Sequence, residues 1–243
     1  ESACKIKAIH KREDGISSID ESKCTRCGAC SYACPFGAIM DKSYILKCID
    51  IAERSKKGQE HAYMVVAPSI SSQFHYAKLP QVISGIKKLG FHDVVEAALG
   101  ADMVAYEEAR ELSEKGQLTS SCCPAFKKYI ETSFPELKDK ISSNLSPMAT
   151  IARYLKELEP DCEVVFVGPC IAKKMEMFRE ESKPYVDCVI TFEELQALFD
   201  AEDIDLASLE ESPLDNASFY GRIFARSGGL TDAPLFRGRD AVL

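Results

Sequence analysis

Short apolar runs alternate with amphipathic stretches from about residue 60 onward, and this alternation predicts a repeated order of strands and helices. The runs YMVVAP at 63–68 and EVVFV at 163–167 are continuous and apolar, which is typical of strands buried on both faces. Residues 186–190 predict a third strand, and residues 118–121 are a short strand candidate. Strands joined by helices in this way predict a mostly parallel sheet with helices over both faces.

Start and stop signals define the helices between these strands. Asp102 is the predicted N-cap of one helix that Gly116 ends, and Ser146 caps another whose first turn holds Pro147. Residues 201–218 are acidic and predict a loop. The predicted helices span residues 77–89, 102–115, 124–133, 146–159, 171–179 and 191–199.

Composition narrows the classes of function. With 243 residues and 46% hydrophobic content, the chain is long enough for a substantial core. The net charge of −8 argues against a nucleic-acid partner, because phosphates need a basic surface. No apolar run approaches a membrane span and no signal peptide is evident, so we expect neither membrane nor export and assign the chain to the cytoplasm. The eleven cysteines cluster with C-x-x-C spacing, which in a reducing compartment indicates metal or redox chemistry.

The densest cysteine pattern lies in the stretch CTRCGACSYACPFGAI at residues 24–39, with the spacing C-x2-C-x2-C-x3-C-P. Residues 4–9 match residues 34–39 at cysteine, alanine and isoleucine, so Cys4 is the end of an internal repeat with an offset of thirty. Zinc is the alternative to an iron–sulfur cluster. It is disfavoured because paired zinc cysteines are normally separated by a longer spacer.

This pattern resembles the two-cluster bacterial ferredoxins, in which the fourth cysteine of each run ligates the other cluster. The resemblance implies one complete [4Fe-4S] ligand set and assigns Cys34 to a second cluster, whose other ligands would lie upstream of residue 1. It also implies a ferredoxin-like domain with a linker helix over residues 1–58, followed by an α/β domain over residues 59–243. The implied ligands of the complete cluster are Cys4, Cys24, Cys27 and Cys30.

Two further cysteine motifs occupy equivalent places in the α/β pattern. In TSSCCPAF, Cys122 and Cys123 follow a strand candidate and precede a helix, and in FVGPCIAKKMEM the same is true of Cys170. Carboxyl ends of parallel strands gather ligands, and helix N-termini favour thiolates. Inert core thiols remain the alternative from spacing alone. Adjacent cysteines seldom reach one metal atom, so we expect Cys122 and Cys123 to have separate tasks.

Together these motifs resemble the first two H-cluster signatures of the [FeFe]-hydrogenases, which read T-S-C-C-P-x-W and M-P-C-x-x-K-x-x-E. The resemblance implies that Cys123 and Cys170 ligate the cubane of the H-cluster, with Cys122 as the free thiol that passes protons to the di-iron unit. Lys173 would donate a hydrogen bond to a cyanide of that unit, and Glu176 matches the glutamate of the second signature.

The resemblance also implies a proton path. AYEEAREL resembles the family helix that carries two relay glutamates, which correspond to Glu108 and Glu111 on one helix face. Ser146 in NLSPMA matches the serine of the same path. A solvated acidic helix face is the alternative interpretation, because a carboxylate relay requires burial that brings its pKa toward working pH.

Departures from the family pattern limit what this chain can do alone. Phe126 replaces the usual tryptophan, and Gly168 replaces a methionine that contacts the di-iron site, as in a divergent ferredoxin-fused group. The third signature, which supplies two cysteines, is missing. Cys162 and Cys188 fall at or within strands, where we expect packing roles. We therefore interpret the chain as an internal portion of a hydrogenase large subunit that holds no active di-iron site by itself.

Two functions follow from the resemblance. The first is an anaerobic oxidoreductase that interconverts H2 with protons and electrons, with ferredoxin as electron carrier and with maturation proteins that insert the di-iron unit. The alternative is a non-catalytic iron–sulfur assembly or electron-transfer protein of the same fold, like Narf and Nar1. Retention of Cys122 together with Lys173 and Glu176 favours the enzyme.

Overall fold

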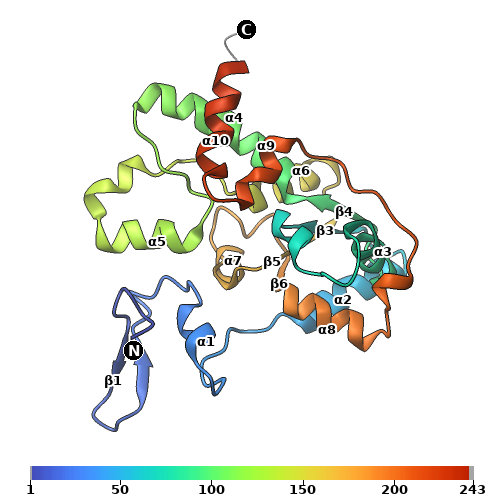
Figure 1. Cartoon of the computed structure of the whole chain (residues 1–243), viewed down its shortest axis with the longest axis horizontal. Coiled ribbons are helices and arrows are strands. Elements are labelled where there is room, and N and C mark those ends of the chain that lie inside the picture. The colour runs from blue at the N-terminus through green and yellow to red at the C-terminus, as the bar shows by residue number, and fades with distance from the viewer. Residues whose placement is uncertain (1, 241–243) are drawn as a thin grey trace.

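The structure is a computed structural model in which residues 2–240 are described. A small cysteine-rich part at the N-terminus, here called the cysteine segment (residues 2–44), lies beside a larger domain built on a four-stranded sheet (Figure 1). In the cysteine segment β1 (Ile9–Lys11) pairs antiparallel with β2 (Ser17–Ile19), and α1 (Ala29–Ala33) follows. Only Ala8 and Thr25 are buried among residues 2–44, so this segment has no hydrophobic core of its own.

The predicted parallel sheet is confirmed. Its order is β4-β3-β5-β6, and every neighbouring pair is parallel, with Val65 of β3 opposite Phe166 of β5. The edge strand β4 was not predicted, because its sequence DVVE has only two apolar residues between acidic ones. The strands are β3 (Ala62–Val66), β4 (Asp93–Glu96), β5 (Glu163–Gly168) and β6 (Cys188–Thr191).

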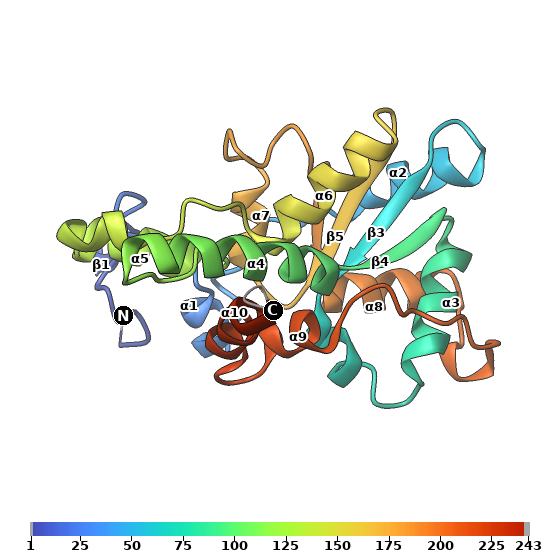
Figure 2. The same ribbon diagram turned by 90° about the horizontal axis from the view of Figure 1, so that it is seen from above.

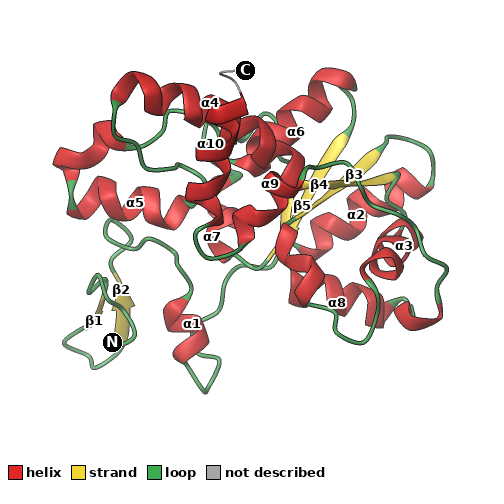
Figure 3. Cartoon of the chain, turned by 45° about the horizontal axis from the view of Figure 1, so that its top comes forward, coloured by secondary structure: helices red, strands yellow, loops and turns green. Residues whose placement is uncertain are grey.

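Helices cover both faces of this sheet, as Figures 2 and 3 show. One face packs against α2 (Ile45–Lys56), α3 (Leu79–Leu89) and α8 (Phe192–Ala201). The other packs against α4 (Ala97–Lys115) and α6 (Pro147–Leu158), which also contact each other. Across residues 2–240, no helix combines the length and the apolarity that crossing a bilayer requires. The remaining helices are α5 (Pro124–Ser133), α7 (Ile171–Glu176), α9 (Phe219–Arg222) and α10 (Gly229–Asp240).

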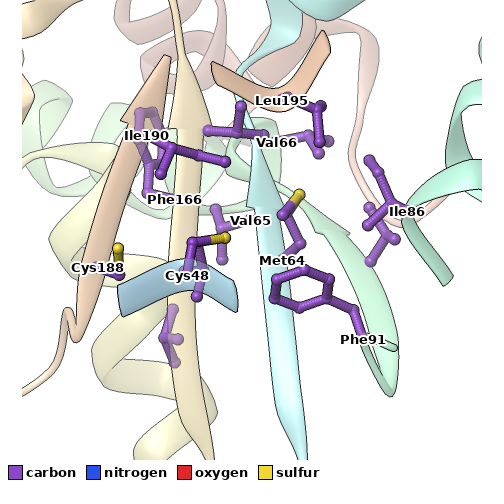
Figure 4. Close-up of a cluster of buried hydrophobic side chains, with 14 of the residues drawn as sticks. Cys48, Met64, Val65, Val66, Ile86, Phe91, Phe166, Cys188, Ile190 and Leu195 are labelled. Atoms are coloured by element: carbon purple, nitrogen blue, oxygen red, sulfur yellow. The ribbon is translucent and has the colours of Figure 1, made fainter. Parts of the chain in front are cut away.

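The core lies on both faces of the sheet, and Figure 4 shows the part of it that the helices α2, α3 and α8 cover, while α6 adds Met148 and Ile151. Cys48 of α2 and Cys188 of β6 are fully buried within it, and Cys162 at the start of β5 is buried as well. Burial raises the pKa of Cys162 to about 11 and that of Cys188 to about 12. Cys162 and Cys188 therefore behave as small apolar core residues, as predicted.

Two local predictions are wrong. The helix predicted to begin at Asp102 begins at Ala97, with Glu96 as the N-cap, because alanine and leucine favour a helix. Gly100 is needed where α6 approaches, since a Cβ there would lie 2.2 Å from Pro147 O. Asp102 lies inside α4 and accepts a hydrogen bond from Ser218 N at 2.8 Å. The strand predicted over residues 118–121 does not join the sheet, since only an isolated bridge links Thr119 with Ile141.

Candidate metal centre and proton path

Four of the cysteines in the cysteine segment face one cavity. Its volume is about 390 Å³, and side chains from the cysteine segment and from α7 form its wall. Cys34 does not line it, in keeping with the separate role that the ferredoxin resemblance gives this residue. The cysteines that line the cavity are Cys4, Cys24, Cys27 and Cys30.

Backbone N–H groups point at the sulfurs of this segment. Ala8 N donates to Cys4 Sγ at 3.2 Å. Thirty residues later the N–H groups of Phe36 and Ala38 lower the pKa of the Cys34 thiol. In both halves of the internal repeat, therefore, the N–H group four residues after the cysteine interacts with the sulfur of that cysteine. Such hydrogen bonds favour thiolate over thiol and are a recognised means of tuning an iron–sulfur cluster.

The donor set and the space fit a four-iron cluster better than a single ion. Within residues 2–240, no three His, Cys, Asp or Glu side chains lie close enough together to bind one metal ion. A cubane is held by four thiolates placed around it, and the four cysteines line one cavity of about 390 Å³. Gly28 has a φ of +80°, and a Cβ there would lie 3.1 Å from Ile171 Cδ1. The glycine therefore lets the cysteine loop approach α7.

The second group of cysteines lies at the N-termini of two helices. Cys123 is the N-cap of α5 and Cys170 is the N-cap of α7, two residues after β5 ends, and these helices pack against each other. Cys122 and Cys123 do not follow a strand of the sheet, so the predicted symmetry with Cys170 holds at the helix ends only. Lys173 Nζ donates to the carbonyl oxygen of Cys122 at 3.0 Å and thereby ties α7 to the double-cysteine loop.

The groups around the Cys122 thiol act on it in opposite directions. Burial raises its pKa, whereas the hydroxyl of Ser120 and the charge of Lys173 lower it, and the net shift is upward. The thiol therefore stays protonated at neutral pH. Lys173 is buried and pairs with the buried Glu176 at 2.6 Å, so its ammonium group is held in place from two sides.

The carboxylate of Glu111 accepts several hydrogen bonds. Ser142 Oγ donates to it at 2.7 Å, Ser143 N donates at 3.0 Å, and Lys115 Nζ lies at 2.7 Å. Asn144 Nδ2 adds a further bond at 3.1 Å. Burial alone would raise the pKa of Glu111, but these partners together lower it, so the side chain is a stable carboxylate.

Glu108 lies one turn earlier on the same helix face, and its pKa is shifted in the opposite direction from that of Glu111. It is 3% exposed, and burial raises its pKa even though the hydroxyls of Ser120 and Ser142 and the backbone N–H of Ser121 act to lower it. Ser120 Oγ lies 2.7 Å from Glu108 Oε1. The alternative interpretation, in which Glu108 and Glu111 lie on a solvated acidic helix face, is therefore excluded, because both side chains are buried and hydrogen-bonded.

Two serines in this network were missed by the sequence analysis. Ser142 contacts both glutamates, and Ser120 connects Glu108 with Cys122, whose backbone N–H donates to Ser120 Oγ at 3.3 Å. The only signal in the sequence is the serine content of TSSCC and ISSN. Their role depends on two loops that meet at the bridge between Thr119 and Ile141, which no local pattern indicates.

Ser146 and Glu176 line a second cavity. Ser146 Oγ accepts a hydrogen bond from Ala149 N at 3.4 Å and caps α6, which confirms the predicted N-cap. Together with Glu176 and Ser121, it lines a polar cavity of about 210 Å³. The structure thus brings these residues to one cavity beside the double-cysteine loop.

Gly168 has a steric reason for departing from the family pattern. A Cβ at this position would lie 2.8 Å from the ring of Phe166 and 3.1 Å from Ala67 Cβ. A methionine would therefore collide with the sheet unless the ring moved. Phe166 fills part of the space beside the end of β5.

Family models match two parts of the chain. Residues 60–240 match the iron only hydrogenase large subunit, C-terminal domain, and residues 17–40 match the 4Fe-4S binding domain. Among solved structures, [FeFe]-hydrogenase HydA1 from Chlamydomonas reinhardtii is similar with a TM-score of 0.68 and 27% identity, covering 81% of this chain and 57% of that chain.

Curated relatives extend the comparison to both candidate functions. The NADP-reducing hydrogenase subunit HndD of Solidesulfovibrio fructosivorans is 29% identical over 90% of this chain and 43% of its own length. Iron hydrogenase 1 of Clostridium pasteurianum is 29% identical over 85% of this chain and 41% of its own length. The cytosolic Fe-S cluster assembly factor NAR1 of Kluyveromyces lactis is 38% identical over 39% of this chain and 20% of its own length. The chain thus spans about two fifths of the two hydrogenases.

Proposed function

We propose that this chain, which belongs to the family of iron-only hydrogenase large subunits, is part of an enzyme that interconverts H2 with protons and electrons. The observation that carries the proposal is the buried polar chain from Glu111 through Glu108 to the Cys122 thiol. A protein that only stores or passes electrons has no use for such a chain. Here it ends beside the two cysteines at the helix N-termini.

The electron side of the proposal rests on the cysteines. Iron–sulfur clusters are the cofactors of this family, and when bound they supply one-electron transfer, while the di-iron unit of an H-cluster supplies the chemistry on H2. Cys4, Cys24, Cys27 and Cys30 are proposed to hold one [4Fe-4S] cluster, and Cys34 a ligand position of another. Cys123 and Cys170 are proposed to hold the cubane of the H-cluster, for which the N-termini of α5 and α7 provide favourable N–H dipoles.

The proton side uses the hydrogen bonds of the structure. Glu111, with its lowered pKa, accepts a proton only transiently, and Ser142 connects it to Glu108. Glu108, with its raised pKa, holds a proton more readily and shares it with Ser120. Cys122 is then the last group of the relay, because Ser120 interacts with its thiol.

The Ser146 cavity offers a second polar surface next to this relay. Ser146 is proposed to take part in the proton path through that cavity, since its oxygen accepts from Ala149 N while its hydroxyl proton is still available for donation. Lys173 is proposed to orient an anionic ligand of the di-iron unit, with Glu176 holding the ammonium group in position. Its bond to the Cys122 carbonyl keeps the donor beside the relay.

Partners follow from the same assignment. An electron carrier such as ferredoxin would exchange electrons through the cysteine segment, and separate maturation proteins would supply the di-iron unit. The proposed compartment is the cytoplasm. The competing function is an assembly role like that of NAR1, which the similarity over 39% of the chain supports. Cys122 with its relay favours the enzyme over this alternative.

The test is infrared spectroscopy of the complete protein after anaerobic maturation. We expect bands of metal-bound carbon monoxide and cyanide in the wild type and in the variant Cys122→Ala. H2 evolution should fall by about a hundredfold or more in that variant, because a general acid is lost while the metal site is retained. Absence of the bands from the matured wild type would contradict the enzyme and favour the assembly role.

A further inference from the structure

The adjacent lysines of α7 point in different directions. Lys173 contacts the double-cysteine loop, as described above, whereas Lys174 contacts the cysteine segment and α8. Lys174 Nζ lies 2.5 Å from Asp41 Oδ2 and 2.7 Å from Glu194 Oε2, and it donates to the carbonyl oxygen of Lys42 at 3.3 Å. The Lys174 side chain is only 4% exposed, so this is a buried ion-pair group.

Lys174, Asp41 and Glu194, here called the Lys174 triad, join three parts of the chain. Asp41 lies at the end of the cysteine segment, Lys174 lies on α7, and Glu194 lies in the first turn of α8. Ser43 Oγ donates to Glu194 Oε1 at 2.5 Å, and Thr191 N donates to Glu194 Oε2 at 2.7 Å. Since the cysteine segment buries almost nothing itself, these bonds are a main attachment of that segment to the sheet domain.

Two members of the triad, Lys174 and Asp41, belong to the wall of the cavity that the four cysteines share. Lys174, Asp41 and Ile171 line this cavity together with the cysteines. Gly28 of the cysteine loop contacts Ile171, which directly follows Cys170. The same helix turn therefore contacts the cysteine loop and carries Cys170.

Charge makes the triad more than a mechanical contact. Burial alone would lower the pKa of Lys174, but Asp41 and Glu194 raise it, so the ammonium group stays charged. Without it, the largely buried Glu194 and the partly exposed Asp41 would lose the cation they share, and a buried carboxylate without a partner is unfavourable. A reduced cluster carries one more negative charge than an oxidised cluster, so a neighbouring cation stabilises the reduced form.

We propose that Lys174 is a positioning residue that holds the cysteine segment against α7 and raises the reduction potential of the cluster in the adjoining cavity. The proposal rests on the cluster assignment made above and not on hydrogenase activity. No group other than Lys174 balances Asp41 and Glu194 together among the ion pairs of the described residues.

The test uses the whole chain reconstituted anaerobically with iron and sulfide. In an EPR-monitored redox titration, K174M should lower the ratio of reduced to oxidised cluster at a fixed potential by roughly threefold or more, as expected for loss of a nearby cation. K174M/E194Q removes a carboxylate together with the cation and should return the ratio toward the wild-type value. The control K78M breaks the exposed pair between Lys78 and Glu211 and should leave the ratio unchanged.

Hydrogen exchange tests the positioning role separately. In K174M the amides of residues 29–44 should exchange faster, while the amides of the β-strands stay protected. An unchanged potential and unchanged exchange in K174M would overturn the proposal, as would an equal response in K78M. Because neither readout uses H2, a failure of hydrogenase activity in the complete protein leaves both measurements valid, and the two proposals fail independently.

Discussion

The cysteine segment and the sheet domain are organised by different forces. In residues 2–44 only Ala8 and Thr25 are buried, whereas β5 is buried along almost its whole length and packs beneath helices on both faces. The sheet domain follows the ordinary rule that apolar burial stabilises a fold. The cysteine segment is too small to do so, and its cysteines line a cavity where a core would be. Regions of this kind derive their stability from the bound group.

The two regions also use cysteine differently. Cys48 and Cys188 are packed like alanine or valine, and burial raises the pKa of both thiols. The backbone instead lowers the pKa of Cys34 in the cysteine segment. Backbone N–H groups thus favour the thiolate at Cys34, whereas burial raises the pKa of Cys24 in the same segment, so full burial and not the direction of the pKa shift distinguishes the core thiols.

The largest effect should come from removing one ligand of the cysteine segment. In Cys27→Ser we expect complete loss of the [4Fe-4S] EPR signal and of hydrogen-exchange protection over residues 2–44, because Cys27 is exposed and contributes no packing. The sheet domain should keep its protection. The matched variant Cys188→Ala should retain the iron content. A cluster signal that persists in Cys27→Ser would contradict the ligand set.

A substitution in the core of the sheet domain should do the opposite: it should destabilise the fold and leave the iron content unchanged. Leu195 of α8 is fully buried against the sheet (Figure 4), and Leu195→Ala should lower the free energy of unfolding by about 3 kcal/mol. Urea denaturation followed by circular dichroism measures this loss. The control Leu46→Ala removes a leucine that is 78% exposed on α2 and should change little. Loss of iron from folded Leu195→Ala would show that the two regions are not independent.

The smallest effect, and the most sensitive to pH, concerns Glu111. Its pKa in the folded protein lies below its ordinary value of 4.5, so its hydrogen bonds stabilise the fold above that pH and lose this effect as the pH falls through the folded value. Glu111→Gln should therefore cost about 1–2 kcal/mol at pH 7 and progressively less below pH 4.5. Glu107→Gln, on the exposed side of the same helix, is the control. A pH-independent difference would contradict the shift.

The strands and most helices could be predicted because their signals are local. EVVFV and YMVVAP are apolar over whole strands, and Ser146 before Pro147 marks a helix start. The N-cap prediction at Asp102 was wrong because aspartate can also lie inside a helix when another segment donates a hydrogen bond to its carboxylate. Here that donor is the backbone N–H of Ser218. The strand β4 was missed because its sequence DVVE has only two apolar residues between two acidic ones, whereas the equally short β6 reads CVIT after Val186 and Asp187.

The candidate site could be predicted only as far as its motifs are contiguous. The spacing of Cys24, Cys27 and Cys30 indicates their common cavity directly, and the repeat adds Cys4. Ser120 and Ser142 act through loops that are distant in sequence and meet near the bridge between Thr119 and Ile141. Contacts of that kind are a property of tertiary structure, so they need coordinates.

The short helix α7 tolerates no insertion or deletion in this part of the chain. Each residue in a helix turns the side-chain direction by about 100°, so inserting or deleting one residue between Cys170 and Lys173 would rotate both lysines away from their partners. The ammonium group that faces the double-cysteine loop would then face the cysteine segment or solvent. A change of length within these few residues should therefore uncouple the cysteine segment from the sheet domain.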